Sequence, residues 1–172
     1  RLIHNLFEVT RMEGGTAVYH PEWVSAGKLM VEADRKYGDL VRDKGITFLA
    51  RAEGMLELQL DKNKIWSVLD NLVYNALRHT PEGGSISLCI SRDVDNRAAL
   101  RVSDTGEGIA AAHLPHIFER FYKVSPERGE KDGSSGLGLY IVKTTAESMG
   151  GSVRVESTLG KGTVFTVTFS AR

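Results

Sequence analysis

Apolar positions recur along the chain with two periods, and the clearest repeat is helical. Between Ile65 and Leu77 they follow the i, i+3, i+4, i+7 spacing that builds one apolar helix face. This pattern predicts a helix that begins at Asp61 and ends near Pro81. A second well-formed helix is predicted over residues 136–149, where a pair of glycines closes it.

Shorter elements are predicted around these two helices. Residues 1–13 carry apolar side chains at helical spacing before Gly14 and Gly15 stop the helix. Ser25 is placed to cap a further helix that runs to about Val41. Strands are expected at residues 22–24, 46–50, 55–61, 85–91, 97–104, 152–157 and 163–169, the last two as a hairpin. The order predicts an α/β fold, a two-layer α/β sandwich with helices on one face of a mixed sheet.

Polar residues interrupt the helix of residues 61–81 at a regular spacing. Because successive helical residues are about 100° apart, Asn71, Asn75, Arg78 and His79 fall on one strip beside the apolar face. Asparagine is an indifferent helix former that prefers caps and turns. This strip is therefore interpreted as the lining of a site.

A glycine-rich segment, DTGEGI (residues 104–109), follows a predicted strand directly. Gly106 and Gly108 allow a sharp turn and a close approach of the backbone to a ligand. Asp104 can accept a hydrogen bond from an amino group, such as the exocyclic amine of adenine. Taken alone, the segment is equally typical of a turn capped by aspartate.

A second segment, DGSSGLGLYIVK (residues 132–143), runs from glycines straight into a helix. Backbone N–H groups and the positive end of the helix dipole then face the preceding loop, as in many phosphate sites. The spacing fits neither the P-loop nor the dinucleotide fingerprint. The alternative is a flexible loop with a simple glycine start.

Between these segments lies IFERFYK (residues 117–123). Phe118 and Phe121 are expected to pin a mobile loop to the core, which would leave Arg120 and Lys123 free to reach phosphates. The alternative is an ordinary amphipathic turn.

Composition narrows the function classes. The chain has 172 residues, 41% of them hydrophobic, which is enough for one core. Because 22 Lys and Arg balance 22 Asp and Glu, no nucleic-acid partner is expected. The single cysteine excludes an internal disulfide, and no apolar run approaches the roughly 20 residues of a membrane span. Since the chain begins with Arg1, it is expected to be part of a longer protein.

Taken together and in this order, the segments resemble the ATP-binding catalytic domain of sensor histidine kinases, the Bergerat (GHKL) fold. The similar segments are NLVYNALRHTP (N box), DTGEGI (first G box), IFERFYK (F box), GSSGLGLYIVK (second G box) and GKGT (third G box). Residues 1–15 look like the end of the dimerisation and phosphoacceptor hairpin of that family. Residues 16–172 would then be the catalytic domain.

The resemblance implies a role for each matching residue. Asn75 would supply an oxygen to Mg²⁺, and Asn71 would help to hold the metal and phosphates. Asp104 would read adenine, residues 110–135 would form a mobile lid over ATP, and Arg120 would act with Asn71 in catalysis. The implied ATP-binding set is Asn71, Asn75, Arg78, His79, Asp104, Gly106, Gly108, Ile109, Lys123, Ser135, Gly136, Leu137, Gly138, Leu139 and Thr163. The family usually has Lys where Arg78 stands and often Tyr where His79 stands.

The implied function is transfer of the γ-phosphoryl group of Mg-ATP to a histidine on the dimerisation domain, for relay to a response-regulator aspartate. The implied partners are that dimerisation domain, the response regulator and a second copy in a homodimer. The domain is expected in the cytoplasm, in a membrane-bound or soluble bacterial kinase.

Three alternatives share the fold. The related ATP hydrolases carry a glutamate where Asn71 stands, and an amide cannot act as a base. The others are an anti-sigma serine kinase and an ATP-sensing pseudokinase, which would lose metal or phosphate ligands. None of the five histidines has the family acceptor's acidic neighbour (His4 precedes Asn5), so the acceptor is expected upstream of Arg1. A metal pair at His113 and His116 is disfavoured because no Cys or carboxylate set accompanies them.

Overall fold

The computed structural model describes residues 2–15, 18–127 and 133–169. Its elements are α1 (Leu2–Glu13), β1 (Glu22–Ser25), α2 (Ala26–Arg42), β2 (Thr47–Ala52), β3 (Glu57–Leu60), α3 (Lys62–His79), β4 (Ser85–Arg92), β5 (Ala98–Asp104), α5 (Gly138–Ser148), β6 (Ser152–Thr158) and β7 (Gly162–Phe169). The predicted order of helices and strands is confirmed, and their boundaries shift by no more than two residues.

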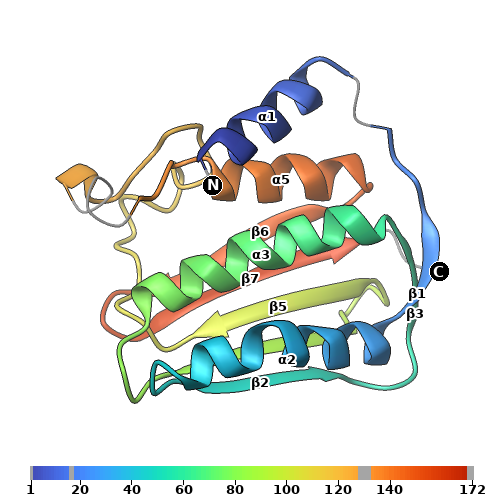
Figure 1. Ribbon diagram of the computed structural model, residues 1–172, viewed down its shortest axis with the longest axis horizontal. Coiled ribbons are helices and arrows are strands. Elements are labelled where there is room, and N and C mark those ends of the chain that lie inside the picture. Colours follow the sequence, from blue (N-terminus) through green and yellow to red (C-terminus); the bar gives the residue numbers. More distant parts are fainter. Residues whose placement is uncertain (1, 16–17, 128–132, 170–172) are drawn as a thin grey trace.

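Five strands form one mixed sheet in the order β2-β4-β5-β7-β6. Strand β2 runs parallel to β4, and the other neighbours are antiparallel. Helices α2, α3 and α5 cover one face of this sheet, which confirms the two-layer α/β sandwich (Figure 1). Strands β1 and β3 pair only with each other among the described strands, in a separate antiparallel sheet that the sequence pattern did not distinguish.

The core lies between the helices and the sheet. The apolar face of α3 is fully buried at Ile65, Leu69 and Leu72, and α3 packs against β4, β5 and α5. Since this face points to the sheet, the polar strip beside it lies at the edge of α3 that meets α5, where the Asn71 side chain reaches Gly138.

Both predicted helix caps are present. The Ser25 hydroxyl accepts a hydrogen bond from the Lys28 N–H group (3.4 Å), and one Asp61 oxygen accepts from the N–H groups of Asn63 and Lys64 (3.0 and 3.2 Å). Side-chain oxygens at this position satisfy N–H groups that lack a partner within the helix.

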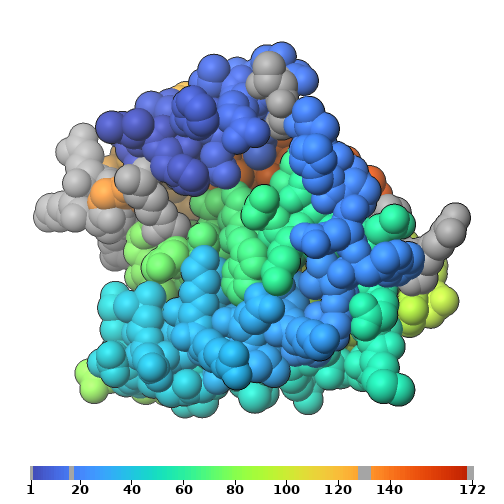
Figure 2. Space-filling view, turned by 45° about the vertical axis from the view of Figure 1, so that its right-hand side comes forward, coloured from blue at the N-terminus to red at the C-terminus, as the bar shows by residue number. Residues whose placement is uncertain are grey.

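Helix α1 lies across α5 at the border of the helical layer and forms one end of the molecular surface (Figures 1 and 2). Its buried Val9 packs with Leu137 and Ile141, and Met12 and Tyr140 flank them. In the three described ranges, no helix is long and apolar enough to cross a membrane.

Candidate functional site

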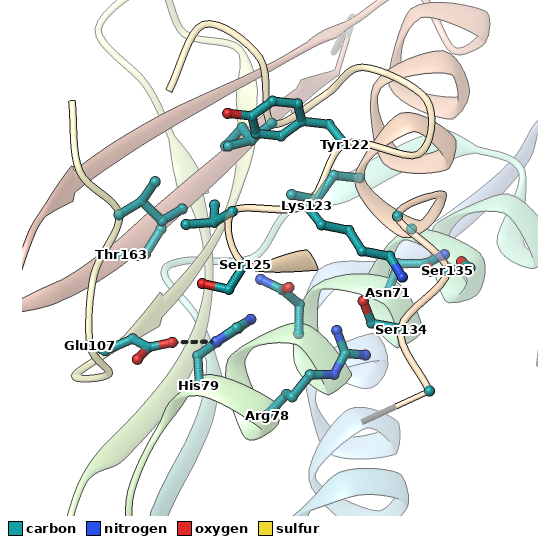
Figure 3. Close-up of a pocket in the computed structure, with 18 of the residues that line it drawn as sticks. Asn71, Arg78, His79, Glu107, Tyr122, Lys123, Ser125, Ser134, Ser135 and Thr163 are labelled. Atoms are coloured by element: carbon teal, nitrogen blue, oxygen red, sulfur yellow. Dashed lines mark hydrogen bonds and ion pairs between the residues drawn. The ribbon is translucent and has the colours of Figure 1, made fainter. Parts of the chain in front are cut away.

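A pocket opens where α3 and α5 meet the ends of β5 and β7 and the segment of residues 107–125 (Figure 3). Much of the predicted set lines it: Asn71, Asn75, Arg78, His79, Asp104, Gly108, Ile109, Lys123, Ser135, Gly136, Gly138, Leu139 and Thr163. Residues from segments far apart in the sequence therefore converge on one cavity.

Three predicted residues stand outside this lining: Gly106, Leu137 and Arg120. The Gly106 N–H group donates to Asp104 (2.8 Å), and a Cβ at Gly106 would lie 2.5 Å from the His79 carbonyl oxygen. Leu137 is fully buried against α1. Gly106 and Leu137 therefore pack behind the residues that line the pocket.

Arg120 differs from the expectation that its side chain is free. Its guanidinium forms an ion pair with Glu13 at the end of α1 and lies 5.6 Å from the centre of the Tyr140 ring. The prediction of a free Arg120 side chain was wrong because its partner, Glu13, lies 107 residues away, where no local sequence pattern indicates it.

The anchoring of the predicted lid also differs in part. Phe118 packs edge-on against Phe165, as expected, but the Phe121 ring is 60% exposed. The buried Ile117 anchors the segment instead, while the Phe121 N–H group donates to the Gly136 carbonyl (2.9 Å).

Residues 110–122 form successive turns, closed by i→i+3 hydrogen bonds. Residues 128–132 of the predicted lid lie outside the described residues. Its mobility stays a prediction.

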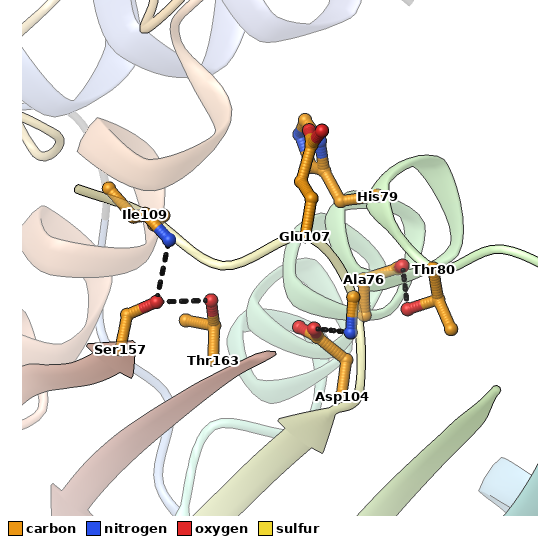
Figure 4. Close-up of polar contacts among 9 residues, drawn as sticks. Ala76, His79, Thr80, Asp104, Glu107, Ile109, Ser157 and Thr163 are labelled. Carbon is orange, nitrogen blue, oxygen red and sulfur yellow. Dashed lines mark hydrogen bonds and ion pairs between the residues drawn. The ribbon is translucent and has the colours of Figure 1, made fainter. Parts of the chain in front are cut away.

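One end of the pocket presents acceptor groups at the ends of β5 and β7 (Figure 4). Asp104 pairs with Thr163 across the two strands. Burial raises the pKa of the Asp104 carboxyl, although the Gly106 and Thr163 N–H groups and nearby His79 favour its charged form. A half-buried carboxylate of this kind suits an amino group of a ligand.

The sequence prediction missed Ser157 of β6, which lies behind this end of the pocket and contacts two of its lining residues. Its hydroxyl accepts from the Ile109 N–H group (2.8 Å) and lies 2.9 Å from the Thr163 hydroxyl (Figure 4). The pairing of Ser157 with Thr163 in the β6–β7 hairpin was the available signal.

Glu107 was missed as well, although it belongs to the DTGEGI segment. It lines the pocket, and its carboxylate lies 2.8 Å from Nδ1 of His79 (Figure 3). The pair joins the end of α3 to the glycine turn after β5.

The other end of the pocket is built for an anion. Leu137, the residue that caps α5, provides no side-chain hydrogen bond to the first turn, whose N–H groups face the loop before the helix. Arg78 and Lys123 line the same end (Figure 3). A helix N-terminus with two cations is an arrangement that binds phosphate.

Two close backbone approaches shape this anion end. Gly136 has a φ of +71°, and a Cβ there would lie 2.8 Å from Phe121 Cα. At Gly138 a Cβ would lie 2.9 Å from Asn71 Oδ1. The Asn71 amide is itself fixed, because its Nδ2 donates to the Ser67 carbonyl (2.8 Å). At both positions the absence of a side chain allows these close contacts at the floor of the pocket.

Asn75 is the residue that fits a metal. It is half-buried in the pocket wall, and its amide forms no hydrogen bond with any other described residue. No three His, Cys, Asp or Glu residues in the described parts of the chain could hold a metal together. A hard cation would therefore need phosphate oxygens beside the Asn75 oxygen.

The two histidines of residues 113–116 have other partners. His113 Nδ1 lies 2.6 Å from the Tyr122 hydroxyl, and His116 Nδ1 lies 2.8 Å from a Glu119 oxygen. These contacts hold the turns of residues 110–122 together.

Almost all residues that line the pocket fall in a region that matches one known protein family. The model of the histidine kinase-, DNA gyrase B- and HSP90-like ATPases matches residues 60–172. The chain belongs to this family. The description of this family names both kinases and ATPases, so the family model alone does not choose between them.

Individual relatives identify the branch. The chain is 30% identical over 170 residues to the sensor histidine kinase WalK of Bacillus subtilis, an alignment that covers 98% of the chain and 28% of WalK. It superposes on full-length ShkA in complex with AMPPNP with a TM-score of 0.83 and 26% identity, over 99% of the chain and 36% of ShkA. For the catalytic domain of histidine kinase ThkA, the TM-score is 0.75 with 25% identity, over 88% and 96% of the two chains. The resemblance to sensor histidine kinase catalytic domains is confirmed, and the chain spans less than a third of WalK.

Proposed function

We propose that this ATP-binding catalytic domain binds Mg-ATP and donates the γ-phosphoryl group to a histidine of a dimerisation domain. The phosphoryl group is then relayed to an aspartate of a response regulator. The observation that carries the proposal is the polarity of the pocket, with a half-buried carboxylate, Asp104, at one end and the α5 N-terminus with Arg78 and Lys123 at the other.

This polarity sets the direction of the nucleotide. Adenine lies at the Asp104 end, where the carboxylate accepts from its exocyclic amine. The phosphates lie at the start of α5, where backbone N–H groups and two cations offset their charge. The AMPPNP complex of ShkA supports an ATP-like ligand in this fold.

Asn75 would hold Mg²⁺ through its amide oxygen, together with the phosphates. Bound Mg²⁺ supplies charge neutralisation at the phosphate oxygens. Asn71 keeps its amide oxygen toward the start of α5, and Arg78 and Lys123 bind phosphate oxygens. Positioning and charge neutralisation supply most of the catalysis in phosphoryl transfer, and these residues contribute both without acting as a general base.

Arg120 acts in catalysis only after its ion pair with Glu13 opens. Both side chains are about half exposed, so the pair adds little stability and exchanges readily for a phosphate contact. Release of Arg120 is thus one step that closes the site.

The acceptor histidine lies on another segment. His4 on α1 is 72% exposed and pairs with Glu8 of the same helix, and it lacks the acidic neighbour of the family's acceptor. We place residues 1–15 at the end of a dimerisation hairpin and this catalytic domain in the cytoplasm, as part of a homodimeric sensor kinase that is either membrane-bound or soluble. The alignment to the sensor histidine kinase WalK covers 98% of the chain and so extends into residues 1–15, which supports a place for this chain within such a kinase.

The test is incubation of the chain with γ-labelled ATP, alone and with a separate polypeptide that carries the dimerisation hairpin of the same protein. An acid-labile label is expected on the partner and not on the chain, while Asn75→Ala abolishes transfer. An acid-labile label on the chain alone would show that one of its own five histidines is the acceptor. An acid-stable label would point to a serine kinase, and binding without transfer to a pseudokinase.

A further inference from the structure

Helix α1 contributes directly to the wall of the pocket. Leu2 and Asn5 line the cavity beside the loop that precedes α5. Asn5 is 6% exposed, and its Nδ2 donates a hydrogen bond to the Ser135 hydroxyl (3.2 Å). That same hydroxyl accepts from the Leu137 N–H group (3.2 Å). A side chain from α1 therefore fixes the serine that orients the start of α5.

Other contacts of α1 fall on the same site. Glu8 accepts from the Ser67 hydroxyl of α3 (3.1 and 3.3 Å), one turn before Asn71. Val9 packs on α5, and Glu13 pairs with Arg120. The helix thus touches α3, α5 and the segment of residues 117–123, which together surround the anion end of the pocket.

The loop of residues 133–136, whose Ser135 is bound by Asn5, is rich in glycine and therefore has high conformational entropy when unconstrained. Gly133 and Gly136 both have positive φ values (+70° and +71°), so the loop between them can take many conformations when unconstrained. Ordering such a segment costs conformational entropy, and a contact that orders it in advance removes this cost from ligand binding.

We infer that Asn5 is a positioning residue for nucleotide binding, and that docking of α1 and occupation of the pocket are coupled. With α1 docked, the Asn5 amide holds Ser135 and the start of α5 in the conformation that receives phosphates. Coupling between two binding events is reciprocal, so nucleotide must stabilise the docked helix by the same factor. The inference rests on the proposed function, since it requires that the pocket takes ATP.

The first measurement is calorimetric titration with a non-hydrolysable ATP analogue and Mg²⁺, on the parent, Asn5→Ala and Ile3→Ala. Loss of a hydrogen bond of this kind predicts about 3- to 10-fold weaker binding for Asn5→Ala. Ile3 is 82% exposed on the same helix, so Ile3→Ala is expected to bind like the parent. If the parent fails to bind, the proposed function is wrong. If the parent binds and Asn5→Ala binds equally well, the coupling is wrong.

The second measurement separates positioning from a merely structural role of Asn5. Hydrogen exchange at the amides of residues 6–13 is followed with and without the analogue. Nucleotide is expected to slow exchange about 3- to 10-fold in the parent and in Ile3→Ala, and much less in Asn5→Ala. Equal exchange of these amides in the free and bound parent would overturn the inference, even if the affinity of Asn5→Ala is reduced.

Discussion

The side-chain oxygen of Asn71 lies 2.9 Å from the point at which a Cβ on Gly138 would stand. Real Cβ atoms almost never approach that closely, so Gly138→Ala must push the amide aside or shift the first turn of α5. Either movement disturbs the anion end of the pocket. If the amide moves, it also loses its hydrogen bond to the Ser67 carbonyl. We expect about tenfold weaker binding of Mg-ATP, measured by calorimetric titration.

Gly27 supplies the matched control for this substitution. It lies in the first turn of α2, and its nearest neighbour to an added Cβ is the Ser25 hydroxyl at 3.8 Å. Gly27→Ala is expected to leave the affinity unchanged and to raise stability by up to about 1 kcal/mol, because alanine loses less entropy in a helix. Equal affinities for Gly138→Ala and the parent would contradict the crowding argument.

Asn75→Ala is expected to remove the part of ATP binding that depends on Mg²⁺. The residue lines the pocket with an amide oxygen suited to a hard cation, and alanine offers no ligand. Titrations with Mg²⁺ and with a chelator should differ strongly for the parent and little for the variant.

Asn63→Ala is the control, since Asn63 is exposed at the other end of the same helix. It should respond to Mg²⁺ as the parent does. A full Mg²⁺ response in Asn75→Ala would show that the metal is held elsewhere.

Asp104 predicts a pH dependence of adenine binding. Burial raises the pKa of this carboxyl, so as the pH falls the folded protein takes up a proton there before the unfolded chain does. Protonation in that window favours the folded state but removes the charged acceptor for the adenine amine. ATP affinity is therefore expected to fall at a higher pH than an ordinary aspartate would give.

The measurement is ATP affinity from about pH 7 to about pH 4, on the parent and on Asp104→Asn. The variant is expected to bind about tenfold more weakly at neutral pH, to discriminate less between adenine and guanine, and to lack this pH step. If it keeps the same step, another group titrates.

Tyr37 allows stability to be changed without touching the pocket. It is fully buried between α2 and α3, and its hydroxyl donates to Asp70, which also pairs with Lys36. Tyr37→Phe leaves one carboxylate oxygen with fewer partners, so the free energy of unfolding should fall by about 1–2 kcal/mol. Denaturant titration measures this loss, and ATP affinity should stay constant.

The contrasting variant is Tyr19→Phe. Among the described residues, the Tyr19 hydroxyl donates to one acceptor, the Gln59 carbonyl, in an exposed hydrogen bond of 3.4 Å. Its loss should change the free energy of unfolding by less than about 0.5 kcal/mol. Equal losses for the two variants would contradict the importance of the Asp70 contact.

Local periodicity was sufficient to predict the helices and strands, but it could not predict side-chain contacts between segments far apart in the sequence. The apolar face of α3 and the caps Ser25 and Asp61 follow from residues within a few positions of one another. The contacts of Arg120 with Glu13 and of Ser135 with Asn5 join residues more than a hundred positions apart. Such pairs depend on how helices dock, which spacing along one segment cannot report.

The sheet order determines when a newly made chain can first form the Asp104 end of the pocket. Strand β7 lies between β5 and β6, so Thr163 pairs with Asp104, and Ser157 contacts Thr163, only when the β6–β7 hairpin adds to the edge of β5. During synthesis, Asp104 leaves the ribosome well before either partner, and an earlier intermediate holds an open strand edge there. The Asp104 end of the pocket can therefore form only after β6 and β7 have been made. A ligand that binds only the complete sheet would stabilise this pairing.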